Sequence, residues 1–134
     1  GLSSRFTYQQ GEEELDDGST APLRHAVPLF GNAHLTYSMK KLIVDLYGVY
    51  QGEIAYQDLA PSEQEKAHLY AIDNKGNPYS PKWLTLNLKI MYRLNKCISL
   101  NAGVENIGDI RYRPYSSGIA AAGRNYVVSA KLNF

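Results

Sequence analysis

Hydrophobic and polar residues alternate strictly along several stretches of this chain. In residues 124–134 one face collects apolar side chains, while the other face is largely polar. The apolar face carries Tyr126, Val128, Ala130, Leu132 and Phe134. Successive side chains of a β-strand point to opposite faces, so this alternation predicts a strand with one apolar and one largely polar face.

The same period of two recurs along most of the chain. The further alternating stretches are residues 83–93, 98–105, 42–51, 32–37 and 5–9. Together with the last stretch they predict six strands in an antiparallel meander, which is an all-β fold. Residues 61–70 open with proline followed by polar residues, and this start predicts one short helical stretch between the strands.

The connections between the predicted strands sort by length. Two are tight turns, at residues 38–41 and 94–96, and three are long and polar, at about residues 11–28, 57–82 and 107–123. Soluble β-sandwiches do not usually collect their short connections at one end, whereas a transmembrane barrel has short turns on one side and long loops on the other. Because about 9–11 residues per strand suffice to cross a bilayer, the pattern favours six strands of a transmembrane β-barrel.

Aromatic residues lie near the ends of the predicted strands, where two interfacial girdles would form. They are Tyr8, Tyr37, Tyr56, Trp83, Tyr92, Tyr126 and Phe134. The composition agrees, with 11 Tyr against 3 Phe and 1 Trp. Tyrosine has an apolar ring and a polar tip, so it suits the headgroup level of a membrane.

Alternation by itself does not say whether lipid or protein covers the apolar face. A soluble ligand-carrying barrel needs about eight strands to close, and six strands leave two open edges that invite edge-to-edge self-association. No signal peptide precedes the first strand, although an outer-membrane protein must be exported. The economical interpretation is that residues 1–134 form one C-terminal barrel segment of a longer chain.

Charge and hydropathy exclude several classes of protein. The 134 residues carry a formal net charge of +1, which provides no basic stripe for nucleic acid. A mean hydropathy of −0.36, without an apolar run of about 18 residues, excludes a transmembrane helix. The single cysteine, Cys97, excludes an internal disulfide and a thiolate zinc site.

The sequence contains none of the common catalytic or phosphate-binding motifs. Ser116 and Ser117 stand beside Gly118 and not beside a candidate base, so we interpret them as part of a hydroxyl-rich loop. We therefore predict a protein that is not an enzyme and has no cofactor.

Metal ligation has little support in the sequence. The three histidines, His25, His34 and His68, are not at ligand spacing, so hydrogen-bonded or solvated imidazoles are the default interpretation. The acidic run at residues 12–17 is interpreted as a solvated loop. The alternative is a contact with calcium or with lipopolysaccharide-bound cations, because hard cations prefer carboxylate oxygens.

Several stretches resemble the closing part of the barrel of TonB-dependent outer-membrane receptors. They are residues 81–88 (PKWLTLNL), 101–109 (NAGVENIGD), 112–118 (YRPYSSG) and 123–126 (GRNY), followed by Phe134. Residues 22–25 (PLRH) and 28–31 (PLFG) resemble the preceding part of that barrel. Gly108 departs from the family pattern, which more often has a bulky apolar residue before the aspartate.

The resemblance implies the C-terminal segment of a barrel of about 22 strands, closed by an N-terminal plug domain that these residues do not contain. Such receptors bind a scarce nutrient (an iron chelate, haem, cobalamin or a glycan). They import it across the outer membrane of a Gram-negative bacterium, using energy that the TonB complex supplies. Two alternatives stay open: a passive binding, adhesin or anchor barrel without energised transport, and a soluble ligand carrier.

The same resemblance implies a set of partners. They are outer-membrane lipid, the chain's own plug domain, the TonB complex and the barrel assembly machinery. The residues that would act as the assembly signal are Tyr126, Val128, Ala130, Leu132 and Phe134.

Charged residues within the predicted strands are confined to the polar face. They are Arg5, Asp45, Glu53, Lys89, Arg93, Glu105 and Lys131. Arginine or lysine facing lipid at the bilayer midplane costs about 2–4 kcal/mol, which accounts for this confinement. Two interpretations stay open: the charges pair with one another, or they contact the plug domain in the lumen.

The two tight turns allow a prediction of strand register. Apolar faces must pair with apolar faces, because a slip of one residue would turn every side chain to the wrong side. The expected pairs are Arg93 with Cys97, Ile90 with Leu100, Leu88 with Ala102 and, in the other hairpin, Tyr37 with Leu42.

Overall fold

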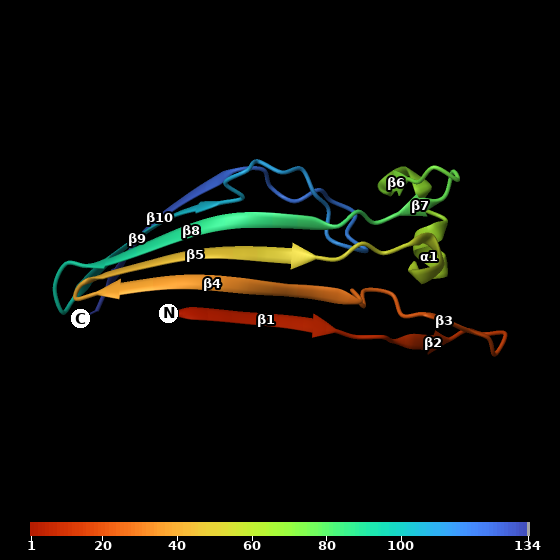
Figure 1. Cartoon of the computed structure of the whole chain (residues 1–134), viewed down its shortest axis with the longest axis horizontal. Helices are drawn as coiled ribbons and strands as arrows, with labels where there is room; N and C mark the ends of the chain where they lie inside the picture. Colours follow the sequence, from red (N-terminus) through yellow and green to blue (C-terminus); the bar gives the residue numbers. More distant parts are fainter. Residues whose placement is uncertain (134) are drawn as a thin grey trace.

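The computed structural model describes residues 1–133, which form one main sheet of six antiparallel strands (Figure 1). These strands are β1 (Leu2–Tyr8), β4 (Leu29–Met39), β5 (Leu42–Gln51), β8 (Trp83–Arg93), β9 (Ile98–Glu105) and β10 (Asn125–Leu132). The spatial order is β1-β4-β5-β8-β9-β10, so each strand pairs with the next of the six along the chain. The predicted all-β meander is confirmed.

The remaining elements are short and lie beyond the end of the sheet that is opposite the tight turns (Figure 1). They are β2 (Glu12–Glu14), β3 (Thr20–Pro22), η1 (Tyr56–Asp58), α1 (Pro61–Gln64), η2 (Ala67–Leu69), β6 (Ala71–Ile72) and β7 (Pro78–Tyr79). β2 pairs with β3, and β6 pairs with β7. The predicted helical stretch is present as α1 followed by η2. The two are separated because Lys66 leaves the helical conformation, with φ −97° and ψ 43°.

The apolar face of the sheet is largely exposed. Its exposed large side chains include Leu2, Phe6, Leu35, Tyr37, Leu84, Leu86, Tyr92, Leu100, Tyr126, Val128 and Leu132. The residues that form the buried hydrophobic core lie in the loops instead, where Ile54, Leu59 and Tyr115 pack together. Within residues 1–133 no second layer covers the sheet, which is the arrangement of a wall whose outer face meets lipid.

Tyrosine side chains lie at both ends of the apolar face. Tyr8, Tyr50 and Tyr126 lie at the loop end, and Tyr37 and Tyr92 lie at the turn end, all on the face that the strand pairing assigns to apolar residues. Aromatic rings at these two levels are typical of the two interfaces of a membrane-spanning barrel.

The predicted girdle is wrong at Trp83. Trp83 pairs with Gln51, so it lies on the polar face of the sheet, where its ring packs on that of Tyr112 with centroids 4.2 Å apart. Tyr50, one position before Gln51, occupies the apolar face at this level. Tyr56 begins the 3-10 helix η1, and Phe134 lies outside the described residues.

The register predicted for the β8–β9 hairpin is wrong by two residues. Leu88 pairs with Val104 instead of Ala102, and Arg93 pairs with Ser99 instead of Cys97. The side chain of Asn95 explains the difference, because its Oδ1 accepts hydrogen bonds from the backbone N–H groups of Cys97 (2.8 Å) and Ile98 (2.9 Å) and so places the turn one residue later. A shift of two leaves every side chain on its predicted face, because the period is two.

The register predicted for the β4–β5 hairpin is also wrong by two. Tyr37 pairs with Val44 and Met39 pairs with Leu42, which leaves only Lys40 and Lys41 in the turn. Lys40 adopts a positive φ of 44°, the conformation that a two-residue hairpin turn requires. The shorter turn extends β4 and again keeps the predicted faces.

Candidate functional site at the loop end

Glu63, in the short helix α1, joins three separate loops. Its Oε1 accepts hydrogen bonds from Arg24 Nε (3.0 Å), Lys66 Nζ (2.9 Å) and Ser116 Oγ (3.0 Å), and its Oε2 accepts one from the hydroxyl of Tyr70 (2.6 Å). Arg24 belongs to the first long loop and Ser116 to the last. The side chain of Glu63 is only 2% exposed, so these donors replace the water that the carboxylate loses.

The electrostatics of this cluster follow from its burial. Burial by itself raises the pKa of the Glu63 carboxyl, but the hydrogen bonds that it accepts outweigh burial and lower the pKa to about 2. The pKa of Tyr70 is raised, first by burial and then by its hydrogen bond to the ionised Glu63. Glu63 is therefore a charged anchor for the loops throughout the ordinary pH range.

A small hydrophobic core lies next to this anchor. Tyr115 packs against Ile54 and Leu59, and its hydroxyl accepts a hydrogen bond from the backbone N–H of Ala60 (3.0 Å), at the start of α1. Its own backbone N–H donates to Gln51 Oε1 (3.3 Å) at the end of β5. The loops are thus fastened to the sheet by contacts between residues that lie far apart in the sequence.

The residues after β9 fold back over the polar face of β8. Asn106, with a φ of 49°, donates its backbone N–H to Asn87 Oδ1 (2.8 Å), and its own Oδ1 accepts from the backbone N–H of Ile110 (2.9 Å). Asp109 Oδ1 accepts from the backbone N–H of Arg124 (2.7 Å). Residues that carry the family resemblance therefore hold the loop after β9 in place.

Gly123 leaves room for this carboxylate. A Cβ atom at Gly123 would lie 2.5 Å from Asp109 Oδ1, so any larger residue would displace the side chain of Asp109. The departure at Gly108 has an explanation too, because the side chain of Ile110 lies 3.3 Å from where a Cβ of residue 108 would stand. A larger residue at position 108 would require the side chain of Ile110 to shift.

On the polar face of the strands, the carboxylate of Asp45 contacts two neighbouring side chains. Its Oδ2 lies 2.9 Å from His34 Nδ1, and its Oδ1 accepts a hydrogen bond from Thr36 Oγ1 (3.1 Å). The His34 ring stacks on Tyr47, with centroids 5.0 Å apart. Among residues 1–133 the pair of Asp45 and His34 is the one close contact between an acidic and a basic side chain of the six strands, and a histidine is charged only when it is protonated. Mutual pairing therefore does not account for the remaining charges of this face.

The other sequence candidates lie apart from one another. His25 occupies the first long loop with a φ of 65°, and His68 lies in η2. Within residues 1–133 no three His, Cys, Asp or Glu side chains come together in a way that could hold a metal ion. The acidic run forms β2 and the following turn, where Asp17 accepts hydrogen bonds from Ser19.

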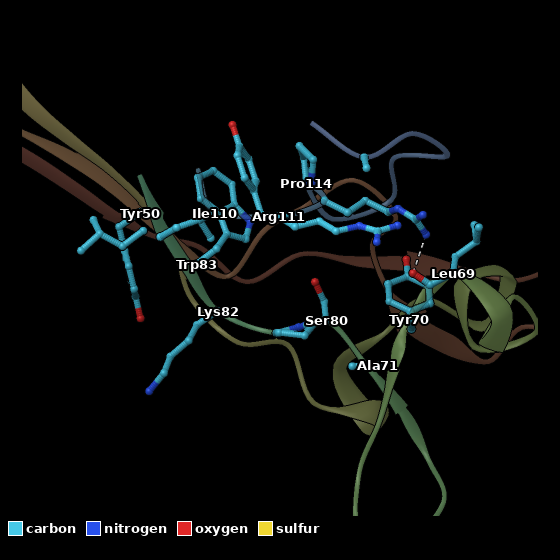
Figure 2. A pocket seen from close by; sticks show the side chains of 15 residues that line it. Tyr50, Leu69, Tyr70, Ala71, Ser80, Lys82, Trp83, Ile110, Arg111 and Pro114 are labelled. Atoms are coloured by element: carbon cyan, nitrogen blue, oxygen red, sulfur yellow. Dashed lines mark hydrogen bonds between the residues drawn. The ribbon is translucent and has the colours of Figure 1, made fainter. Parts of the chain in front are cut away.

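A cavity of about 830 Å³ opens where β8 extends beyond the end of β9 (Figure 2). It lies between residues 69–71 and 80–84 on one side and residues 110–114 on the other. Arg113 is one of the residues that line it and donates from Nη1 to the carbonyl of Leu69 (2.5 Å), the hydrogen bond drawn as a dashed line in Figure 2. Trp83 and Arg113 line the cavity, and each has a buried side-chain donor, Nε1 and Nε respectively, without a hydrogen-bond partner among residues 1–133.

Sequence reasoning missed both the Glu63 cluster and this cavity. Glu63 lay within the predicted helical stretch, and nothing in its neighbourhood in the sequence pointed to Arg24, 39 residues away, or to Ser116, 53 residues away. Tyr126, Val128, Ala130 and Leu132, which the sequence analysis named as the assembly signal, share one exposed face of β10. Phe134 lies outside the described residues.

No helix within residues 1–133 is long and apolar enough to cross a membrane. No protein-family model matches the sequence, and no curated protein sequence matches it. Solved structures do match. The copper transporter OprC is 18% identical, with a TM-score of 0.72, and the match covers 99% of this chain and 21% of that chain.

Receptors for iron chelates match as well. A variant of the ferric enterobactin receptor PfeA from Pseudomonas aeruginosa, in complex with enterobactin, is 19% identical with a TM-score of 0.67, over 99% of this chain and 20% of that chain. The ferric-catecholate import receptor Fiu from E. coli is 18% identical with a TM-score of 0.64, over 99% and 18%. The chain has the fold of a TonB-dependent receptor barrel.

The TonB-dependent receptor fold explains the unusual architecture of the segment. The chain spans about a fifth of the length of the structures that it matches. A sheet with one exposed apolar face, two open edges and a cluster of loops at one end is what one portion of a large barrel wall contributes. The named neighbours are a transporter and receptors, not enzymes.

Proposed function

We propose that residues 1–134 form the C-terminal wall segment of a TonB-dependent receptor that imports a scarce nutrient across the outer membrane of a Gram-negative bacterium. The observation that carries the proposal is the six-stranded meander whose match to such receptors extends over 99% of the chain. The segment supplies wall and loops, and the plug domain and the TonB-contacting motif belong to the remainder of the complete receptor.

Each face of the segment has a partner in this proposal. The apolar face contacts outer-membrane lipid, and the polar face with Asp45, Lys89 and Glu105 contacts the plug domain or the water-filled lumen. β1 and β10 stand at the two edges of the sheet and pair with neighbouring strands of the complete barrel. An isolated segment leaves both edges open and is expected to self-associate through them.

The experiment that tests the proposal is energised uptake by the complete receptor. Copper and ferric catecholates are the first nutrients to test, since OprC is a copper transporter and PfeA and Fiu are receptors for ferric chelates. Cells that carry the receptor should accumulate the nutrient only while the TonB complex is intact. Binding without TonB-dependent accumulation would instead support a passive binding or anchor barrel.

Protease sensitivity tests the orientation of the segment. Trypsin added to intact cells is expected to cleave after Lys75, which is exposed at the turn between β6 and β7, and to spare Lys40 and Lys41 in the turn between β4 and β5. The reason is that the long loops face the exterior in this proposal. Lys40 and Lys41 should be cleaved only after the membrane is opened, and cleavage there in intact cells would mean that the topology is inverted.

The assembly signal is proposed to be the apolar face of the last strand, with Phe134 in phase with it. Serine at both Tyr126 and Phe134 is expected to lower the amount of complete receptor in the outer membrane severalfold without changing its synthesis, because the assembly machinery recognises that face. The matched control is Val127→Ser, on the opposite face of β10 and also exposed. Equal membrane levels for the two variants, measured by immunoblotting of membrane fractions, would contradict the assignment.

A further inference from the structure

The upper part of β8 has a backbone edge that no strand covers. β9 pairs with β8 only as far as Leu88, and beyond this point the backbone N–H of Ile107 donates to the carbonyl of Leu86 (2.8 Å). Within residues 1–133 no strand pairs with the start of β8 on this side. The cavity of about 830 Å³ lies beside the uncovered edge, between residues 80–84 and residues 110–114. We call this gap in the wall the notch.

The geometry of β8 points free backbone groups into the notch. Successive residues of a strand direct their N–H and C=O groups to opposite sides in the plane of the sheet. Leu86 directs its carbonyl away from β5, towards Ile107, so Leu84, two positions before it, faces the same way. Neither backbone group of Leu84 has a hydrogen-bond partner on this side within residues 1–133. The edge therefore offers one N–H donor and one carbonyl acceptor to a further strand.

The opposite wall of the notch carries unpaired polar groups as well. The backbone N–H and C=O groups of Arg111 and Arg113 make no hydrogen bond with other backbone groups of residues 1–133. Two side-chain donors of lining residues, Arg113 Nε and Trp83 Nε1, are buried without a partner in the same part of the chain. A ligand that supplies acceptors here pairs with groups that have already lost their water.

The charges that line the notch are all positive. Lys82, Arg111 and Arg113 line it, whereas no aspartate or glutamate among residues 1–133 does. Figure 2 shows Arg111 pointing to the side of the cavity where Leu69 lies, and Lys82 pointing away from that side. Arg111 is exposed and makes no ion pair within residues 1–133. Its guanidinium group is therefore free to bind a carboxylate of a ligand.

We propose that the notch binds an extended, acidic peptide segment of a partner molecule that arrives from the outer side of the membrane. One residue of the peptide pairs with the N–H and C=O groups of Leu84 and adds a short strand to β8. A carboxylate of the same peptide pairs with Arg111. The inference rests on the proposed function only for the side from which the partner arrives.

A peptide matches the notch because both walls present backbone groups. Each amide of an extended peptide carries a donor and an acceptor, so it can pair with Leu84 on one wall and with the backbone of Arg111 or Arg113 on the other. Five extended residues span about 16 Å, the same length as residues 80–84 in an extended conformation. The positive lining then selects peptides that carry negative charge.

The test measures binding of a synthetic peptide to the complete receptor, purified in detergent, by fluorescence anisotropy. The probe is a labelled pentapeptide of alternating valine and threonine that ends in an amidated glutamate. One control peptide has methylated backbone nitrogens and cannot pair with a strand edge, and the other ends in an amidated glutamine and lacks the negative charge. Both controls should bind the wild type about tenfold more weakly or worse.

Two variants test the two walls separately. Leu84→Pro removes the N–H that faces the notch and leaves the pairing with β5 intact, because this N–H points away from β5. It should bind the acidic peptide about fivefold more weakly than its matched control Leu84→Ala, which keeps the N–H. Arg111→Gln should weaken binding of the acidic peptide about tenfold and leave binding of the glutamine peptide unchanged. Lys75→Gln, in an exposed turn outside the notch, is the charge control.

Several outcomes would overturn the proposal. They are failure of the acidic peptide to bind the wild type, equal binding of the backbone-methylated peptide, and equal losses in Arg111→Gln and Lys75→Gln. If Leu84→Pro does not insert into the membrane, the comparison of the acidic and methylated peptides on the wild type still decides whether the edge is used. A receptor that imports its nutrient without binding the peptide contradicts only this inference. A receptor that binds the peptide without TonB-dependent import contradicts only the proposed function.

Discussion

Replacing Leu88 with arginine is expected to abolish insertion of the complete receptor into the outer membrane. Leu88 is the middle residue of the apolar face of β8, between Leu86 and Ile90, and pairs with Leu46 on one side and Val104 on the other. An arginine there faces hydrocarbon near the bilayer midplane, where it costs about 2–4 kcal/mol. The measurement is the amount of heat-modifiable receptor in outer-membrane fractions.

The matched control places the same side chain on the opposite face. Ser129→Arg is suitable, because Ser129 is exposed on the polar face of β10 and pairs with Asn101. Asn87, although it neighbours Leu88 on the polar face, is unsuitable because it is buried and accepts the backbone hydrogen bond of Asn106. Normal insertion of Leu88→Arg, or an equal loss with Ser129→Arg, would show that the apolar face does not meet lipid.

Replacing Glu63 with glutamine is expected to loosen three loops together. Glutamine keeps the size of the side chain but removes the charge that Arg24 and Lys66 share. The shift of the Glu63 pKa from 4.5 to about 2 corresponds to roughly 3 kcal/mol, and the partial exposure of both cations reduces the expected effect to about 1–3 kcal/mol. Hydrogen exchange should become faster in residues 22–26, 60–71 and 114–117, while exchange in the six strands stays unchanged.

The pH dependence gives this prediction a second readout. Since the folded-state pKa of Glu63 is lowered, its contribution is present above pH 4.5 and is lost as the pH falls from 4.5 towards about 2. Loop exchange in the wild type, corrected for the intrinsic rate, should rise over that window, whereas Glu63→Gln should stay flat. Glu65→Gln is the control, because Glu65 is exposed two positions further along. A pH response of Glu63→Gln as large as that of the wild type would refute the assignment.

The sequence was sufficient for the six strands of the main sheet and, apart from the girdle position given to Trp83, for the faces of their residues. Alternation around Leu86 and Leu88, and around Val128 and Ala130, depends only on the period of two that every strand has, so the sides of these residues followed directly. The sorting of short and long connections then pointed to a membrane-spanning wall, and the motif around Asn106 pointed to the family.

The details that escaped prediction were set by side-chain hydrogen bonds and long-range contacts. Asn95 fixes the start of one turn through its side-chain oxygen, Oδ1. Lys40 adopts a positive φ, which is uncommon for lysine and therefore could not be predicted from its residue type. Each of these two features shifted the register of its hairpin by two residues, and every side chain stayed on its predicted face of the sheet. Glu63 and Arg24 meet only after the loops fold over the end of the sheet, so no local pattern could bring them together.

The anchoring of three loops on one carboxylate has a consequence for how these loops can change during evolution. Arg24, Glu63 and Ser116 all lie within this one wall segment, so a substitution in any of these loops alters the support of the other two. Recombination that exchanges a single loop between related receptors would separate these partners, whereas exchange of the whole segment keeps them together. The segment is therefore expected to be exchanged between related proteins as a whole, and substitutions in its three loops are expected to occur together.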